Sequence, residues 1–304
     1  MIMKYENLSQ HPHLFRTCTG ITVREFDDVC DDVLPLYVQA EEQRLSRPDR
    51  IRALGAGHPF RLAARDHLLL TVVWLRLYPN HEVLGYLFGV SDSTVSRLIE
   101  RVLPLLEQAG RDTMRLPDPG KKQRRQLSEL LDDLPELTIV VDSFEQRVQR
   151  PPDDNSHFSG KKKQNTLKSQ IAVDGQTGYI VDTSPSVPGP TPDLTLLKQS
   201  HLLRRLPDAT GCAGDLGYLG LDKECEHGFI PRRKPRGKER PPEDIPYNRA
   251  FSAFRVVVEW VIGRLRRFQS LAQTDRNHRR QHAARVAAVA GLVNRQAFFQ
   301  GLRP

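Results

Sequence analysis

Three acidic residues stand at positions where a charge is costly. Asp142 follows the apolar run LTIVV, Asp215 lies in the glycine-rich stretch GCAGDLGYLG, and Glu259 lies in the apolar segment VVVEWVIG. A carboxylate that is removed from water needs a hydrogen-bond partner, a cation or a metal ion. Mg²⁺ prefers a few carboxylates together with waters and substrate phosphates. The three acids together therefore predict a magnesium site that acts on phosphodiesters.

Each acid also has an ordinary structural interpretation. Asp142 can cap a turn, and Asp215 can form the turn in which it lies. Glu259 can pair with Arg255 one helical turn earlier, or with Arg266. Both interpretations stay open for each acid alone, and the occurrence of three acids in three separate elements favours the metal site.

The charge balance indicates the kind of partner. The chain has 304 residues and a formal net charge of +8, which favours a polyanion, either nucleic acid or an anionic membrane surface. It contains no apolar run of about 18 residues, and MIMKYENLSQHPHLF lacks the apolar core of a secretory signal. We therefore expect a nucleic-acid partner and no membrane. None of the four cysteines forms a Cys-x-x-Cys pair, which argues against a zinc site and for a reduced, cytoplasmic chain.

Residues 61–107 have the pattern of a helix-turn-helix. An apolar helix ends near Pro79, a short helix runs from His81 to Phe88, and a third helix, capped by Ser91 or Asp92, runs to about Glu107. The third helix presents short polar side chains and an arginine at its start, which suit phosphates and base edges. These residues are Ser93, Thr94, Ser96 and Arg97. An ordinary helical hairpin is the alternative interpretation.

Composition divides the chain into two parts. We expect a helical N-terminal domain over residues 1–110, in which a helix over 22–46 is broken at Pro35. A charged, proline-containing segment over 111–136 is typical of a linker. Residues 137–300 then form the second domain.

The second domain alternates extended and helical patterns. Its first strand, 137–141, is followed by LKSQIAVD and YIVDTSPSV, which are separated by the turn GQTG. Further short strands lie on either side of GDLGYLG. The helical stretches cover residues 194–206, 248–269 and about 279–299. This order predicts an α/β domain with helices packed on a mixed sheet.

Six blocks in this order resemble bacterial insertion-sequence transposases of the DDE class, nearest to the insertion-sequence-five group and its Harbinger-like relatives. The blocks are VDSFEQRVQRP, SGKKKQNTLKSQIAVD, VPGPTPDLTLL, GDLGYLG, PRRKPRGKE and RVVVEWVIGRLRRFQ. The resemblance covers residues 137–296, and the helix-turn-helix matches the smaller N-terminal domain of the same family. It implies an RNase H-like fold with a mixed five-stranded sheet flanked by helices.

The resemblance assigns the catalytic and metal-binding triad to Asp142, Asp215 and Glu259. It implies two Mg²⁺ ions, with Mn²⁺ as a substitute, of which Asp142 holds both and the other two acids one each. Asp193 matches a position where the family often has an acid, and we expect a supporting role, such as a helix cap. Ser252 and Arg266 replace the tyrosine and lysine of the family's Tyr-Arg-Glu-Lys pattern. Arginine keeps the charge, whereas the loss of tyrosine removes any stacking there.

The resemblance also implies the reaction and the partners. Water cleaves a strand at the element's end, and the freed 3′-OH attacks target DNA. The partners are the terminal inverted repeats and the target, bound by a homodimer or larger assembly at the nucleoid. Basic loops next to the sheet are expected to grip phosphates: Lys161, Lys162, Lys163, Arg232, Arg233, Lys234 and Arg236, with Arg266. The alternatives are a regulatory or domesticated DNA-binding protein and an RNase H-like nuclease that does not join strands.

Overall fold

The computed structural model describes residues 3–46, 61–118, 131, 134–135, 137–149 and 156–301. Most of the predicted linker, including its KKQRRQ run, lies outside these residues. No helix among them is long and apolar enough to cross a membrane.

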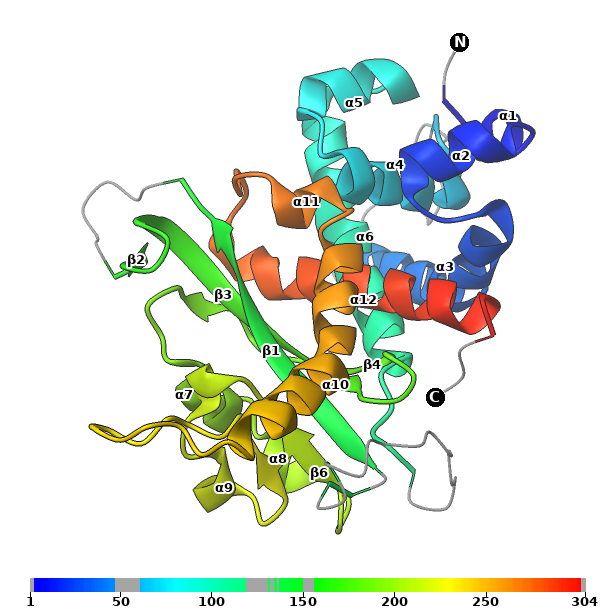
Figure 1. Ribbon diagram of the computed structural model, residues 1–304. Helices are drawn as coiled ribbons and strands as arrows, with labels where there is room; N and C mark the ends of the chain where they lie inside the picture. The colour runs from blue at the N-terminus through cyan, green and yellow to red at the C-terminus, as the bar shows by residue number, and fades with distance from the viewer. Residues whose placement is uncertain are drawn as a thin grey trace.

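The described residues of the N-terminal part contain helices and connecting turns but no strand (Figure 1). It contains α1 (Tyr5–Leu8), α2 (Pro12–Thr19), α3 (Val23–Leu45), α4 (Ala64–Leu77), α5 (His81–Phe88) and α6 (Asp92–Asp112). The predicted break at Pro35 is wrong, because α3 continues through it. The helix buries Phe26, Val29 and Val33, and each such side chain is worth about 1.5–3 kcal/mol. Together they outweigh the roughly 3 kcal/mol cost of an internal proline.

The helix-turn-helix consists of α5 and α6, and the predicted bounds of α5 are confirmed. Gly89 ends α5 with a φ of 68°, a conformation that favours glycine. Ser91 caps α6, because its Oγ accepts a hydrogen bond of 3.2 Å from the Thr94 amide. The α6 helix ends at Asp112, later than predicted.

A mixed sheet forms the second part of the chain. Its strands are β1 (Thr138–Arg147), β2 (Phe158–Ser159), β3 (Gln164–Asp174), β4 (Ile180–Thr183), β5 (Val187–Pro188), β6 (Gly211–Ala213) and β7 (Gly228–Phe229). β3 is antiparallel to β1 on one side, whereas β6 is parallel to β1 on the other and β7 is parallel to β6. β2, β4 and β5 pair antiparallel with β3. The order β4-β3-β1-β6-β7 is the predicted RNase H-like sheet, and β2 and β5 are short additions to it.

Helices cover both faces of the sheet (Figure 1). α10 (Asp244–Leu265) and α12 (His282–Phe299) share one core with Val140 and Ile171, and α11 (Gln269–Ala272) and the 3₁₀ turn Arg279–Gln281 connect them. α7 (Asp193–Gln199), α8 (Leu202–Arg205) and α9 (Leu221–Glu224) pack on the opposite face.

The prediction of a single helix over 194–206 is wrong. His201 takes a φ of 54° between α7 and α8 and interrupts the helix. Leu197 and Leu202 both pack into the same core against the sheet. Residues five apart in an uninterrupted helix point in directions about 140° apart, from 3.6 residues per turn. The break therefore allows both leucines to face the sheet.

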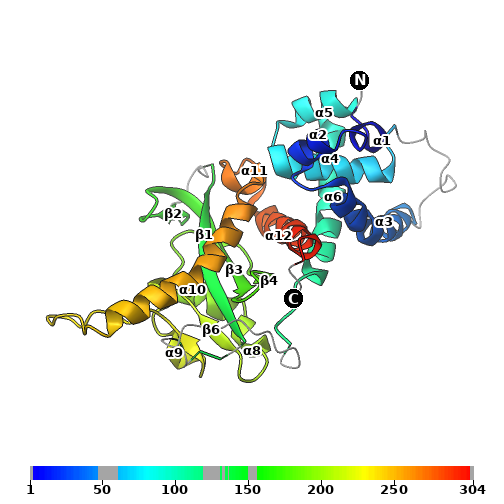
Figure 2. The same ribbon diagram turned by 45° about the vertical axis from the view of Figure 1, so that its right-hand side comes forward.

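The helix-turn-helix lies against the second part of the chain through α12 (Figure 2). Gly291 of α12 and Gly110 of α6 touch backbone to backbone, so that a Cβ on Gly291 would collide with Gly110. Arg295 forms ion pairs with Asp28 and Asp32 of α3. The Asn294 side chain donates to Thr113 Oγ1, just after α6, at 3.2 Å and to the Ile180 carbonyl of β4 at 2.8 Å. One continuous apolar core therefore joins the two parts.

Candidate active site

The register of two parallel strands brings Asp142 and Asp215 to the same level of the sheet. β6 pairs with β1 from Thr138 to Val140, and Ala213 lies opposite Val140. Asp142 and Asp215 come two residues later on each chain. Neighbouring strands are about 4.8 Å apart, so both carboxylates lie at the edge where β6 ends.

The apolar run 137–141 had suggested that the strand ends before Asp142. In the structure, Asp142 lies within β1. β3 continues to pair with β1 as far as Arg147, which extends the strand beyond the apolar residues. The Asp142 Oδ1 accepts a hydrogen bond of 2.8 Å from the Ser143 amide, and its Oδ2 lies 3.6 Å from Arg255 Nη2. Burial, together with the negative charges of Asp215 and Asp193, raises the pKa of Asp142 to about 6.

Asp215 forms a turn, as its glycine-rich surroundings suggested. It precedes the 3₁₀ turn Leu216–Tyr218, and its Oδ1 accepts a hydrogen bond of 2.8 Å from the Gly217 amide. Tyr218 is fully buried and donates to Gln170 Oε1 at 3.1 Å. A Cβ on Gly214 would lie 2.7 Å from the Tyr218 ring, so glycine allows this close packing. The second oxygen of Asp215 is not used by the turn.

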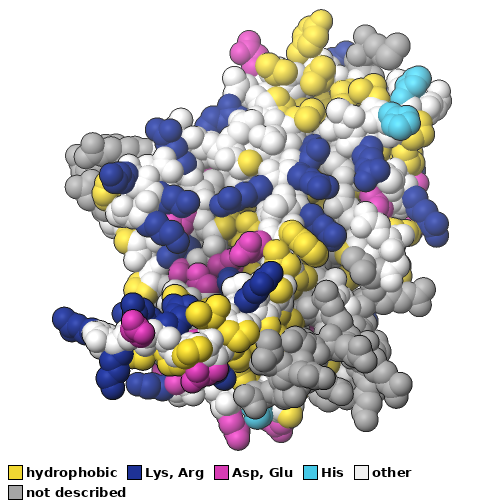
Figure 3. All heavy atoms as spheres, in the orientation of Figure 1, with side chains coloured by type: hydrophobic (Ala, Val, Ile, Leu, Met, Phe, Trp, Pro, Cys, Tyr) yellow, Lys and Arg dark blue, Asp and Glu magenta, His cyan; other side chains and the backbone are white. Residues whose placement is uncertain are grey.

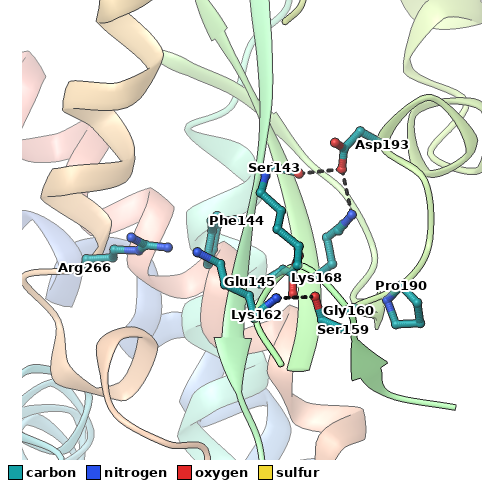
Figure 4. A pocket seen from close by; sticks show the side chains of 12 residues that line it. Ser143, Phe144, Glu145, Ser159, Gly160, Lys162, Lys168, Pro190, Asp193 and Arg266 are labelled. Carbon is teal, nitrogen blue, oxygen red and sulfur yellow. Dashed lines mark hydrogen bonds and ion pairs between the residues drawn. The ribbon is translucent and has the colours of Figure 1, made fainter. Parts of the chain in front are cut away.

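Asp193 is held by two side chains of the sheet (Figure 4). Its Oδ1 accepts from Ser143 Oγ at 2.7 Å and from Lys168 Nζ at 2.9 Å. Lys168 is buried in β3 and also donates to the Thr191 carbonyl at 2.6 Å. Asp193 is the first residue of α7, whose N-cap is Pro192, so it is not the helix cap that we expected. Its Oδ2 faces Gly217, where an added Cβ would lie 2.5 Å away.

Glu259 lies one turn after Arg255 on α10 and is exposed. Residues four apart share one side of a helix, so Glu259 follows Arg255 along the side that meets Asp142. Neither predicted ion pair forms: Arg255 pairs with Asp142, and no ion pair in the described part of the chain involves Glu259. The glutamate therefore remains available to a ligand.

The acids have the chemistry of metal ligands but stand apart from one another. No group of three or more His, Cys, Asp or Glu side chains in the described ranges lies close enough to hold an ion. Asp142 is nevertheless half-buried beside two other acids, and among the described residues its ion-pair partner, Arg255, lies 3.6 Å away. Like charges separate without a counter-ion, and all of these oxygen donors suit a hard divalent cation. The donor set fits such an ion.

A cationic pocket lies next to these acids (Figure 4). Its volume is about 310 Å³, and Lys161, Lys162, Arg266 and Glu145 line it with Ser143. Lys162 and Arg266 point toward each other from the loop after β2 and the end of α10. Figure 3 shows acidic side chains in the middle of this face with Lys and Arg side chains around them. Lys163 lines a neighbouring pocket with Arg147 and Asn165.

The basic segment after β7 contains two kinds of residue. Arg233, Lys234 and Arg236 are exposed. Arg232 instead contacts α10: its guanidinium lies 4.0 Å from the centre of the Tyr247 ring and 3.5 Å from Asp244 Oδ1. The structure thus gives Arg232 intramolecular partners that its position in a basic run did not indicate.

At the start of α6, the predicted DNA-binding residues form a local network. Ser93 and Arg97 are exposed, whereas Thr94 and Ser96 are half-buried. Arg97 folds back onto Ser93 and donates to its carbonyl at 3.1 Å and its Oγ at 3.2 Å. Arg61, Arg97 and Arg101 line a hollow of about 320 Å³ beside this helix start.

Two residues of the site did not emerge from the sequence as candidates, Lys168 and Ser143. Lys168 had one usable signal, since it is the only charged residue among the buried positions 166–173 of β3. Ser143 had none beyond its place next to Asp142.

Comparison with known proteins identifies the family. The model of a family described as DDE superfamily endonuclease matches residues 141–294, about half of the chain. The chain belongs to this family. The model described as helix-turn-helix of DDE superfamily endonuclease matches residues 60–112, which decides against an ordinary helical hairpin.

A relative that this DDE superfamily endonuclease matches over nearly its whole length supports the same assignment. The chain is 28% identical over 294 residues to a protein of Microchaete diplosiphon described as a probable transposase for insertion sequence element IS702. The match spans 96% of this chain and 98% of that protein. The comparison with solved structures gave no significant match. The resemblance to insertion-sequence DDE transposases is confirmed.

Proposed function

We propose that the protein cuts DNA strands at the ends of an insertion element and joins them to target DNA, with Mg²⁺ or Mn²⁺ as cofactor. The observation that carries this proposal is the β1–β6 register, which brings Asp142 and Asp215 together where β6 ends. α10 adds Arg255 at Asp142 and Glu259 one turn further on. The division of the chain into a DNA-binding domain over 1–110, a linker and a catalytic domain over 137–300 belongs to the same proposal.

Asp142, Asp215 and Glu259 would hold the metal. When bound, divalent cations activate the attacking oxygen and neutralise charge on the leaving oxygen. The protein itself balances the charges of these acids and holds the DNA phosphates in position. Arg255 partly compensates the charge of the half-buried Asp142, and Lys168 does the same for Asp193. Lys161, Lys162 and Arg266 can hold the phosphates that flank the reacting bond.

The reaction consists of two successive displacements at phosphorus. In the first, a water oxygen bonds to the phosphorus and the 3′-oxygen leaves as a hydroxyl. In the second, this 3′-OH bonds to a target phosphorus and displaces a target 3′-oxygen. Bonds are exchanged in both steps without a covalent enzyme intermediate, so catalysis depends on positioning and charge stabilisation.

DNA recognition falls to the helix-turn-helix. The start of α6 carries Ser93, Thr94, Ser96 and Arg97, and further arginines line the adjacent hollow. Such a helix start suits contacts to phosphates and base edges in the major groove. Pairing of two element ends implies at least a homodimer on DNA.

The test is strand cleavage on a labelled fragment that carries the element's end. We expect Mg²⁺-dependent nicking and joined products with the wild type, and neither with Asp142→Asn or Glu259→Gln. Equal activity of all three proteins would refute the assignment of the site. Cleavage without joined products would identify a nuclease, and repeat binding without cleavage would identify a regulatory protein.

A further inference from the structure

Residues 231–243, which we call the arm, project from the molecule beyond the start of α10 (Figure 2). The arm contains six Lys or Arg residues, and residues 232–240 are all exposed. At the tip, Gly237 has a φ of 74°, and no atom lies within 4 Å of an added Cβ. The tip is therefore not packed on the body of the protein.

Arg232 fixes the base of the arm to α10. Its amide donates to Asn248 Oδ1 at 2.7 Å, and its carbonyl accepts from Asn248 Nδ2 at 2.9 Å. Its guanidinium contacts Tyr247 and Asp244. The cations beyond Arg232 make no ion pair in the described part of the chain: Arg233, Lys234, Arg236, Lys238 and Arg240. The arm thus combines an anchored base with a cationic tip that has no intramolecular task.

The α10 helix places the arm and the helix-turn-helix on opposite sides of the active site. Arg255, at Asp142, lies about three turns after the start of α10, which is about 16 Å at 1.5 Å per residue. Arg266 lies about 16 Å further along, at the cationic pocket. Just beyond it, Arg76 of α4 donates to the Arg267 carbonyl and lies 5.7 Å from the centre of the Phe268 ring. The helical part therefore meets the far end of α10.

We propose that the arm binds the phosphates of DNA outside the element: the flank before cleavage and the target during joining. This inference rests on the proposed function. If the helix-turn-helix holds the terminal repeat, DNA beyond the scissile bond leaves on the side away from that domain, where the arm lies. The distance of about 16 Å along α10 is the length of about five base pairs at 3.4 Å each. Exposed Lys and Arg side chains bind phosphates irrespective of sequence, as a partner that changes at every insertion requires.

The test compares binding to two duplexes by fluorescence anisotropy over 50–200 mM salt. One duplex ends at the element boundary, and the other continues for about 15 base pairs of random sequence, longer than the five-base-pair reach. The arm variant is Arg233→Gln/Lys234→Gln/Arg236→Gln/Lys238→Gln. The control, Arg204→Gln/Lys223→Gln, removes two exposed cations from α8 and α9.

We expect the wild type and the control to bind the longer duplex more tightly, and the arm variant to lose only this increment. The slope of log K against log salt should fall by about 0.9 for each phosphate that the variant no longer neutralises. Equal weakening on both duplexes, or none on the longer one, would overturn the proposal. An arm variant with an altered oligomeric state and unchanged DNA affinity would also overturn the proposal, and would show that the arm contacts a second protein chain instead. Because binding is measured without catalysis, an inactive wild type would refute the proposed function and leave this test intact.

Discussion

The Lys168→Met substitution tests whether the buried lysine holds Asp193 in place. Lys168 and Asp193 form an ion pair of 2.9 Å, with side-chain exposures of 10% and 20%. Removal of one partner from a buried pair costs about 3–5 kcal/mol. Water reaches Asp193 in part and Ser143 still donates to it, so we expect a loss of about 2–3 kcal/mol in the free energy of unfolding, at or below the low end of that range.

Urea unfolding of four proteins measures this loss: wild type, Lys168→Met, Asp193→Asn and the double variant. Lys168→Arg is the matched control, because it keeps the charge at the same position. The double variant should be less destabilised than the sum of the single variants, since each partner acts through the other. A Lys168→Met protein within about 0.5 kcal/mol of the wild type, the range of an ordinary surface substitution, would refute the reasoning.

Two further predictions concern α12, at its contact with the sheet through His282 and at its contact with α6 through Gly291. Burial, with the nearby charge of Arg285, lowers the pKa of His282 to about 3. Stability from the neutral ring is then complete above about pH 6.5 and is lost at about 1.4 kcal/mol per pH unit below it. His282→Gln should therefore show a flatter dependence of unfolding free energy between about pH 6.5 and 5, and parallel curves would contradict this. Gly291→Ala should lower the free energy of unfolding by about 1–3 kcal/mol, and the melting temperature with it, because the added Cβ forces α6 and α12 apart. An unchanged melting temperature would show that the two helices can separate at no cost.

Local patterns were sufficient to predict the helix-turn-helix and the sheet domain. The end of α5 followed from Gly89 and the start of α6 from the capping residue Ser91, both of which act within a few residues. The order of strands and helices likewise identified the α/β class. These features depend on short-range chemistry, which a single sequence contains.

Features that depend on pairing between distant segments were not predictable. Asp142 lies inside β1 because β3 continues to pair with β1 as far as Arg147, although the pairing with β6 ends at Val140. The Lys168–Asp193 pair depends on where α7 begins relative to β3. Pro35 lies inside α3 because tertiary packing outweighs the local preference. The anchoring of Arg232 by Asn248 joins an exposed loop to a helix and leaves no periodic signal.

The central claim is that Asp142 is a metal ligand of the cleavage reaction. The most direct measurement is cleavage by Asp142→Cys in Mg²⁺ and in Mn²⁺, because a thiolate binds softer ions than a carboxylate does. We expect activity to be lost in Mg²⁺ and at least partly restored in Mn²⁺, with the wild type active in both. Equal loss in the two ions, or full activity in Mg²⁺, would contradict direct coordination by Asp142.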